Sequence, residues 1–562
     1  MVTKSTFSDH LFIPDTPVDG TQGAVVAIDL GCAFTKVSYW DQEDNCSCTL
    51  RLDGESSIPT AIAYSDRNDF CIGVEAIQRL QTTPKQVIQY FPYLLGKTWD
   101  DSLGATMRDL GVTEFATTDA NNSIWHILIG ETNVKLSLFD VYDDFLTTLL
   151  EKIESSLNKN VAKVVMVVTS KEKLILDFLS SLSERIGVAL EPVLSSTCMC
   201  LSYGFYDDCV RKSLLLLDFG WESTRVQVID HSNNTYCFGP SCSCDSLSGR
   251  ALFTGLCEAI DDQMSKENRQ LLKSNYAFQN KKQINAYQCL NHTKNIIMLQ
   301  KADKVYRLKD YQVHVGISSS LFKRVALSAI EAFNSALRGF LDESSIPIDS
   351  FDDVLISGGV ANCNYVYDYI RSTFRNTFFP DLLTIYNPNN NANESVIVNG
   401  AAVQCAAWMG YSMKDLQSLL FIDLLPHDIF IKTETGYEIV IPKGASVPSR
   451  RTVEFVLTEE NQTSLSVEIF RNASTSDDYV KIGEFEFTLN PEELPDSSVG
   501  ITITVAENGG ISAECTGAYE PEVNIMNVII LSLALLVLVI AYLFLKFYFR
   551  ETRLLLGENR SL

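Results

Sequence analysis

The chain has 562 residues, of which 46% are hydrophobic and 20% charged, so it is long enough for several domains and is not a disordered protein. Its net charge of -25 comes from 70 acidic and 45 basic side chains. This excess argues against nucleic acid as a direct partner, because phosphate backbones are repelled. The 15 cysteines lack the two-residue spacing and histidine neighbours of zinc sites, which favours reduced thiols used as small apolar residues.

Residues 1–22 form a polar lead-in with no apolar run long enough for a signal-peptide core. From residue 23 to 415, short apolar runs alternate with longer amphipathic stretches, which predicts an α/β domain. Four of the apolar runs are predicted to be strands, at residues 24–28, 164–168, 214–217 and 354–356.

Three of these strands end in glycine turns: Asp29 to Gly31, Asp218 to Gly220, and the pair Gly358 and Gly359. Such turns let backbone amides approach an anion closely, while the aspartate carboxylate holds a metal ion or its water. One turn alone is weak evidence, because Gly and Asp are common in ordinary turns. Three of them, far apart in one chain, predict two similar halves that close on a nucleotide.

In this order the turns resemble the two phosphate loops and the adenosine-side loop of the seventy-kilodalton heat-shock chaperones, the Hsp70 family. The similar segments are 25–37, 214–226 and 352–366, with a hinge-like segment at 190–205 and a closing helix at 396–408. The resemblance implies an actin-like nucleotide-binding domain over residues 23–415. It also implies ATP or ADP with Mg²⁺ as the cofactor.

By the same resemblance, the nucleotide contacts fall on eight residues: Asp29, Gly31, Asp218, Gly220, Ser223, Lys294, Gly358 and Gly359. Asp29 and Asp218 are the two that would hold Mg²⁺ through water.

Several other positions depart from the family pattern. Cys32 and Ala33 replace two threonines, Trp221 and Glu222 replace two glycines, and Thr169 stands near the place of a proline. Pro92 and Ser195 occupy the positions expected for the catalytic lysine and for a glutamate of the hinge. Hydrolysis needs a cation that stabilises charge as water attacks. We therefore expect no intact catalytic set, an inefficient ATPase at best, and nucleotide that binds weakly or not at all.

Residues 416–425 resemble the family's interdomain linker, and 426–518 resemble the β-sandwich that holds client peptides. Alternating apolar residues at 464–470 and 483–488 independently predict strands there. The helical lid that follows the sandwich in the family is absent, so 519–526 form a short juxtamembrane segment. The partners implied are unfolded or nascent polypeptides and a J-domain protein. Within the family, the details look most like the atypical member of the ribosome-associated complex.

A C-terminal membrane helix is predicted at 527–549, followed by a short basic tail at 550–562. Residues 528–545 are apolar apart from Ser532 and Tyr542, and at ~1.5 Å per residue they nearly cross a ~30 Å hydrocarbon layer. A buried core helix is the alternative, but too little chain follows to surround it. Without a signal peptide, we expect tail-first insertion with the N-terminal part in the cytosol. The basic residues after the helix favour the opposite orientation.

Two functions remain open. The first is a membrane-anchored pseudo-chaperone or co-chaperone scaffold with degraded ATPase machinery. The second is an active ATP-dependent Hsp70 chaperone with slow turnover. A sugar or acetate kinase of the same fold is disfavoured, because such enzymes have no C-terminal β-sandwich of this type.

Overall fold

The computed structural model describes residues 9–10, 23–79, 82–83, 86–95, 115–117, 125–129, 134–170, 173–204, 212–232, 235–262, 304–308, 313–317, 319–374, 395–410, 420–425, 428–433, 436–457, 462–472, 479–489, 498–505 and 511–516. The chain divides into two compact units. The first unit comprises Met1–Asp428, Ile441–Ser449 and Thr504–Ser512, and the second comprises Ile429–Val440, Arg450–Ile503 and Ala513–Leu562.

The first half of unit 1 is built on a six-stranded sheet with the order β13-β12-β2-β3-β4, and β5 pairs with β3. Strands β13, β12 and β2 are parallel, whereas β3 is antiparallel to β2, β4 and β5. The strands are β2 (Ala24–Leu30), β3 (Phe34–Asp41), β4 (Cys46–Thr49), β5 (Ile58–Pro59), β12 (Val161–Val168) and β13 (Ala189–Leu194).

The second half of unit 1 has a seven-stranded sheet with the order β1-β20-β16-β15-β14-β19, and β23 pairs with β20. Strand β14 has a parallel neighbour, β19, and an antiparallel hairpin partner, β15, just as β2 has β12 and β3. The predicted similarity of the two halves is therefore confirmed in their strand order. The strands are β1 (Asp9–His10), β14 (Lys212–Phe219), β15 (Thr224–Ser232), β16 (Thr235–Cys244), β19 (Asp353–Ser357), β20 (Leu420–Leu424) and β23 (Ser446–Val447).

Both sheets are buried on two faces, which explains the continuous apolar runs at their central strands. Side chains alternate across a strand, so Val26 and Ile28 enter the outer core of the first half, while Val25 and Ala27 face a central core. Strand β14 behaves in the same way, with Leu216 in the central core and neighbouring leucines in the outer core of the second half.

The central core lies between the two sheets and contains helices α5 (Ser195–Tyr203) and α12 (Val396–Trp408). The predicted closing helix coincides with α12. The two helices touch backbone to backbone, because a Cβ added at Gly400 would lie 1.7 Å from the carbonyl oxygen of Cys198. Only glycine fits at this position. Beside it, the Asn399 amide oxygen accepts a hydrogen bond from Ser38 of β3 at 3.2 Å.

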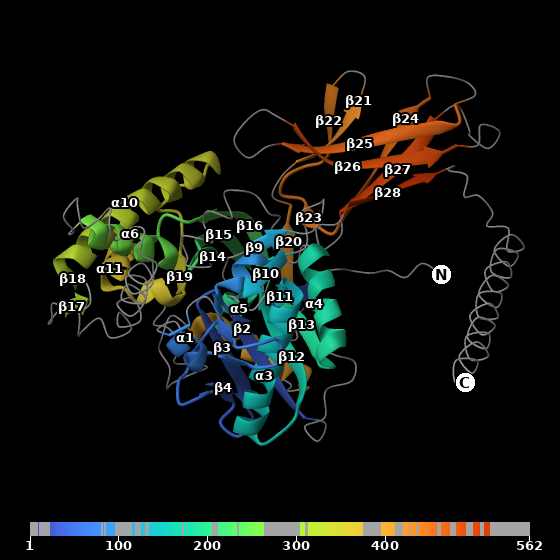
Figure 1. Cartoon of the computed structure of the whole chain (residues 1–562). Helices are drawn as coiled ribbons and strands as arrows, with labels where there is room; N and C mark the ends of the chain where they lie inside the picture. Colours follow the sequence, from blue (N-terminus) through green and yellow to red (C-terminus); the bar gives the residue numbers. More distant parts are fainter. Residues whose placement is uncertain are drawn as a thin grey trace, which may run out of the picture. The chain divides into compact units, whose positions relative to one another are not determined.

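Outer helices complete the two halves (Figure 1). Helix α3 (Leu138–Leu157) begins at a capping box formed by Ser137 and Asp140 and, with α4 (Lys173–Ile186), covers the first half. Helices α6 (Gly249–Asp262), α10 (Ser319–Glu343) and α11 (Asn364–Thr373) contribute to the second half. The smaller elements are β6 (Ala61–Tyr64), β7 (Phe70–Ile72), α1 (Val74–Arg79), β8 (Val87–Gln89), the 3₁₀ helices η2 (Phe91–Leu94) and η6 (Gly359–Asn362), β9 (Phe115–Thr117), β10 (Trp125–Ile129), β11 (Val134–Ser137), β17 (Lys304–Leu308) and β18 (Val313–Ile317).

The segment predicted as the interdomain linker contains strand β20, which joins the second sheet of unit 1. It runs parallel to β16, with Phe421 opposite Tyr236, and antiparallel to the short strand β23, with Asp423 opposite Val447. Strand β1, in the N-terminal lead-in, also pairs with β20. The linker is therefore held in a sheet by backbone pairing.

The C-terminal strands form two sheets, β22-β21-β25-β26 and β24-β27-β28. Strand β25 is antiparallel to β21 and to β26. Alternate residues of β27, such as Val499, Ile501 and Ile503, are buried, as expected for a sandwich strand with one covered face. Strands β25 and β26 confirm the two strands predicted here. The bounds are β21 (Ile429–Thr433), β22 (Gly436–Ile441), β24 (Ser449–Val456), β25 (Ser464–Asn472), β26 (Tyr479–Thr488), β27 (Ser498–Val505) and β28 (Ile511–Thr516).

Within the described residues, no helix combines the length and the apolar character needed to cross a membrane. The predicted juxtamembrane segment 519–526, membrane helix 527–549 and tail 550–562 all lie outside the residues that the structure describes. The prediction that the helical lid is absent falls on the same residues, outside the part of the chain that the structure describes.

Candidate nucleotide site

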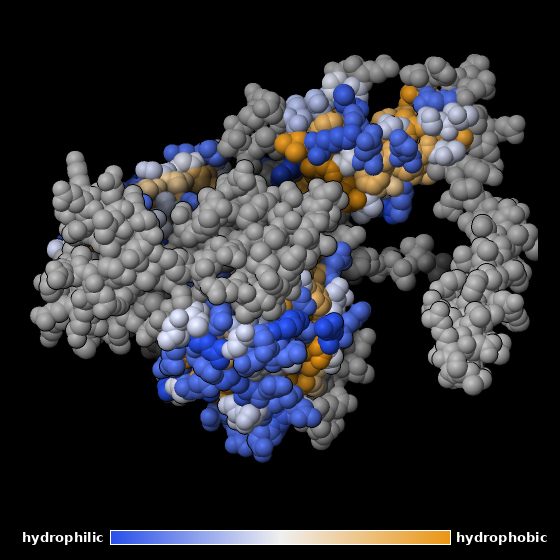
Figure 2. All heavy atoms as spheres, in the orientation of Figure 1, coloured by the Kyte–Doolittle hydropathy of each residue, from blue (hydrophilic) through white to orange (hydrophobic). Residues whose placement is uncertain are grey.

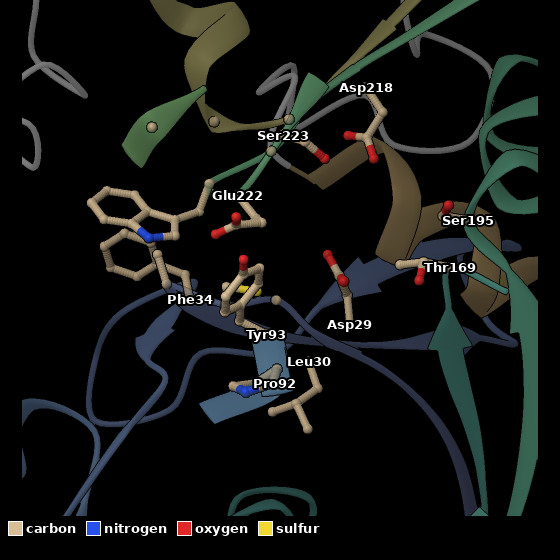
Figure 3. Close-up of a pocket in the computed structure, with 18 of the residues that line it drawn as sticks. Asp29, Leu30, Phe34, Pro92, Tyr93, Thr169, Ser195, Asp218, Glu222 and Ser223 are labelled. Atoms are coloured by element: carbon tan, nitrogen blue, oxygen red, sulfur yellow. The ribbon is translucent and has the colours of Figure 1, made fainter. Parts of the chain in front are cut away.

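A cavity of about 790 Å³ lies in unit 1, where strands β2 and β14 of the two halves end. Residues from both halves line it. It brings together all the site residues named from the sequence that the structure describes: Asp29, Gly31, Pro92, Ser195, Asp218, Gly220, Ser223, Gly358 and Gly359. Lys294 is outside the described residues. Figure 3 shows Asp29 and Asp218 extending into this cavity from opposite strands.

Asp29 lies near the end of β2 and is paired with a lysine. The Lys36 Nζ atom is 3.8 Å from the Asp29 Oδ2 atom, and the Asp29 side chain is 17% exposed. Burial raises the pKa of Asp29; the charge of Asp218 raises it further, while Lys36 and Arg225 lower it. The net effect is a raised pKa, so two nearby cations compensate only part of the cost of burying this carboxylate.

Asp218 is held by a different set of contacts. The Ser357 hydroxyl, on the neighbouring strand β19, donates a hydrogen bond of 2.7 Å to Asp218 Oδ1. Arg225 lies opposite Asp218 in the β14–β15 hairpin, and its guanidinium donates to the Ser195 hydroxyl at 3.1 Å. Ser195 stands where the family resemblance predicts a glutamate. Its hydroxyl therefore accepts a hydrogen bond from a cationic side chain.

Lys36 and Arg225 occupy equivalent places in the two halves. Lys36 is the cross-strand partner of Asp29, and Arg225 is the cross-strand partner of Asp218. The sequence analysis missed both residues. The sequence does contain a signal for them, because Lys36 follows Asp29 and Arg225 follows Asp218 at the same spacing along the chain. In a hairpin, this spacing places the two residues opposite each other.

Trp221 fills part of the second phosphate loop. Its ring stacks on that of Tyr90, with centroids 5.0 Å apart, and meets Phe253 at 5.8 Å. A Cβ added at Gly249 would lie 2.5 Å from the Trp221 Cε3 atom, so the indole packs directly on the backbone at the start of α6. The Arg250 amide donates to the Trp221 carbonyl at 2.8 Å.

Glu222, the next residue, belongs to a charged network. Arg250 Nη2 lies 3.1 Å from Glu222 Oε1 and 3.4 Å from Asp245 Oδ2. The Tyr93 hydroxyl lies toward Glu222 (Figure 3). Burial and the Glu222 charge raise the pKa of Tyr93 to about 12, although Arg250 acts in the opposite direction. Tyr90, Tyr93 and Arg250 were also missed, because their roles depend on contacts between distant segments.

The third turn brings two strands close together. Gly358 has a φ of 94°, and a Cβ at this position would lie 2.2 Å from the Phe219 carbonyl oxygen. A side chain cannot be placed there, so the glycine is required for β19 to end beside β14. Among the residues that the structure describes, no group of three or more His, Cys, Asp or Glu side chains is arranged to hold a metal ion.

Two equivalent hairpin turns face one cavity, in a chain that also carries a linker strand and a second unit built of β-strands. The family described as Hsp70 protein matches residues 25–526, and the chain belongs to this family. The resemblance found in the sequence is thus confirmed. Members of the family bind ATP or ADP with Mg²⁺, unfolded polypeptides and J-domain co-chaperones.

The similarity to individual relatives is low in identity but long. The protein named Heat shock 70 kDa protein, mitochondrial, of Pisum sativum is 21% identical over 523 residues, which cover 90% of this chain and 74% of that protein. Two proteins named Chaperone protein dnaK1, from Prochlorococcus marinus and Parasynechococcus marenigrum, are each 20% identical and cover 88% of this chain. The matches span 72% and 73% of those two proteins.

Proposed function

We propose that this protein is a membrane-anchored pseudo-chaperone that binds unfolded or nascent polypeptides without turnover of ATP, and that can serve as a co-chaperone scaffold. The observation that carries the proposal is the second phosphate loop. There, the Trp221 ring and the Glu222 carboxylate take up space and charge beside the cavity.

The residues of the cavity fit a magnesium nucleotide poorly. A phosphate chain would meet the carboxylates of Asp29, Asp218 and Glu222, and like charges repel strongly where water is scarce. A divalent cation near Asp29 would have to displace or approach Lys36. Pro92, at the expected lysine position, lies in the cavity lining and supplies no charge. We therefore propose that nucleotide binding is weak or absent.

The β-sandwich supports the binding of polypeptides. Ile439 and Val456 are 52% and 79% exposed, and Tyr437, Tyr479 and Val480 are also exposed. Tyr437 and Tyr479 stack with ring centroids 3.7 Å apart. Figure 2 shows hydrophobic residues at the surface of these strands beside hydrophilic ones. Apolar side chains gathered at a surface are typical of sites that bind other chains.

A slow, active chaperone is the second candidate. It is favoured by Asp29, Asp218 and the two glycines Gly358 and Gly359, which line one cavity in the arrangement expected for the family. The two candidates differ in their response to nucleotide, because only the second hydrolyses ATP and requires it to change the affinity for polypeptide.

The test uses the full chain in detergent with a fluorescent, extended apolar peptide. We expect peptide binding with fast release, the same rate of release with and without MgATP, and no release of phosphate above that of a heat-denatured sample. A peptide that dissociates over many minutes, or an ATP-dependent release rate, contradicts the proposal. An ATP-dependent release rate supports the slow chaperone.

The proposed anchor is the apolar segment 527–549, with the large N-terminal part in the cytosol. A J-domain protein is the proposed co-chaperone partner, in line with the sequence likeness to the ribosome-associated member of the family. Protease treatment of intact membranes, with a deglycosylation control, tests the orientation. A protected N-terminal part that carries sugar contradicts it. The acceptor sites that would then be exposed include Asn45, Asn233, Asn291, Asn393, Asn461 and Asn472.

A further inference from the structure

Two contacts cross the cavity side by side and join the two halves of unit 1. Tyr90 and Tyr93 come from the first half, next to and within η2, whereas Trp221 and Glu222 come from the turn between β14 and β15. The first contact is the Trp221–Tyr90 ring stack. In the second, the Tyr93 hydroxyl lies toward the Glu222 carboxylate (Figure 3). Trp221 packs against the outer cores of both halves.

The first half presents its two tyrosines rigidly. Tyr90 is 3% exposed and has a φ of 58°, in the left-handed region that non-glycine residues rarely adopt. The Tyr93 amide donates to the Tyr90 carbonyl at 3.0 Å, and Pro92 lies in the first turn of η2. Proline fixes the backbone φ of this turn. The backbone that carries the two rings is therefore defined by this turn.

The second half fixes the opposing residues just as firmly. Gly249 and Phe253 pack on the Trp221 indole, and the Arg250 amide holds the Trp221 carbonyl. The Arg250 guanidinium also pairs with Glu222 at 3.1 Å. The buried Trp221 indole N–H makes no hydrogen bond within the described part of the chain. Trp221 is thus positioned by ring packing and by its backbone.

Side chains of the protein partly offset the charges that a bound ligand would otherwise meet. Lys36 and Arg225 act on Asp29, Ser357 donates to Asp218, and Arg250 pairs with Glu222. A phosphate chain and its cation normally supply such compensation between two lobes. Here side chains of the chain itself supply part of it.

We propose that Tyr90, Tyr93, Trp221 and Glu222 form an internal latch that holds the two halves of unit 1 closed without nucleotide or Mg²⁺. This inference rests on the proposed function, because a closed cavity suits a protein that does not turn over ATP. Strand β20 lies in the same sheet as β14 and β15.

Hydrogen exchange on the full chain in detergent tests the latch. Amides of residues 86–95, 219–225 and 420–424 are followed with EDTA, with MgADP and with MgATP. We expect the same protection in all three conditions. In the double variant Trp221→Leu with Tyr93→Phe, we expect exchange in 86–95 to become about tenfold faster, because both contacts across the cavity are lost.

A matched control and a milder variant keep the test decisive. Glu75→Gln removes a carboxylate that pairs with Arg79 on α1 at 3.8 Å and does not line the cavity, so it should leave 86–95 unchanged. Glu222→Gln removes charge with little change of shape and should accelerate exchange in 86–95 alone, which tests the latch even where the double variant does not fold.

Two results overturn the latch. In the first, the exchange protection of the natural chain changes with nucleotide or with EDTA. In the second, a folded Glu222→Gln or double variant keeps the same protection as the natural chain. These outcomes are separate from the proposed function. A chain that hydrolyses ATP while its protection stays constant contradicts the pseudo-chaperone proposal and supports the latch. Protection that follows nucleotide without hydrolysis contradicts the latch and the proposed weak binding of nucleotide, but leaves the proposed absence of ATP turnover standing.

Discussion

The indole ring of Trp221 lies parallel to the phenol ring of Tyr90, with an interplanar angle of 2° and ring centroids 5.0 Å apart. Stacked aromatic pairs contribute about 0.5–1.5 kcal/mol beyond the burial of their surface. The residue proposed to obstruct the second phosphate loop is therefore also a residue that stabilises unit 1. Changes at this position should alter ligand binding and stability in opposite directions.

Replacing Trp221→Gly together with Glu222→Gly should strengthen the binding of ATP, because backbone amides become accessible and one carboxylate is removed. The same change should lower the free energy of unfolding by about 2–4 kcal/mol through the loss of a large packed ring. Calorimetric titration with MgATP and denaturant unfolding measure the two effects. Trp221→Phe is the control that keeps a ring. Binding of ATP by the natural chain with sub-micromolar affinity would sink this prediction.

Asp29→Asn should flatten the dependence of stability on pH. The folded protein raises the pKa of Asp29, so above its ordinary pKa of about 4 the folded state binds a proton more tightly than the unfolded state. This contribution to stability is then lost as the pH rises through the folded pKa. Denaturant midpoints between pH 4 and pH 7 should fall less for Asp29→Asn than for the natural chain.

Asp53→Asn is the control for that measurement, because Asp53 pairs with Lys152 at 3.0 Å and is 43% exposed. An unchanged slope in the Asp29→Asn protein would show that the carboxyl is not the titrating group.

Tyr93→Phe should remove an alkaline loss of stability. The pKa of Tyr93 is raised to about 12, above the ordinary value of ~10, so the folded state favours the protonated phenol. The associated stability is lost as the pH rises from about 10 toward 12. At neutral pH the variant should be about 1 kcal/mol less stable, because the phenol no longer interacts with the Glu222 carboxylate.

Thermal unfolding of the natural and Tyr93→Phe chains at pH 8, 10 and 11 checks this prediction. The two unfolding temperatures should converge as the pH rises. A constant difference over this range contradicts the role of the phenol.

Pro92→Lys should not restore hydrolysis of ATP. A lysine at this position would supply a positive charge, but Ser195 remains in place of a carboxylate and already accepts a hydrogen bond from Arg225 at 3.1 Å. Glu222 would also remain beside the cavity and attract the new cation. Release of labelled phosphate should stay at the level of the natural chain. An increase of about tenfold or more would show that the lysine alone limits turnover.

The sequence predicted the fold where local pattern and turn chemistry coincide. The strands before Asp29 and Asp218 are buried on two faces, so their composition alone marks them, and the closing helix coincides with Val396–Trp408. These elements could be predicted although the identity to relatives is low, because each needs only apolar residues of suitable size.

The site was harder to predict, because its contacts join segments that are distant in the chain. Trp221 was recognised as an obstacle, yet nothing in its neighbourhood of the sequence points to Tyr90. Lys36 and Arg225 could have been found only by placing them opposite the aspartates in two hairpins. Side-chain pairs of this kind depend on register and packing, which the order of residues does not show directly.

The close crossing of α5 and α12 at Gly400 also has a chemical consequence. It leaves the thiols of Cys198, Cys200 and Cys405 buried, and burial raises the pKa of each above its ordinary value. Only the thiolate reacts with alkylating reagents, so these three thiols stay inert while the helices touch. Their alkylation rate therefore reports how often the central core opens, and the protein carries this probe without any added label.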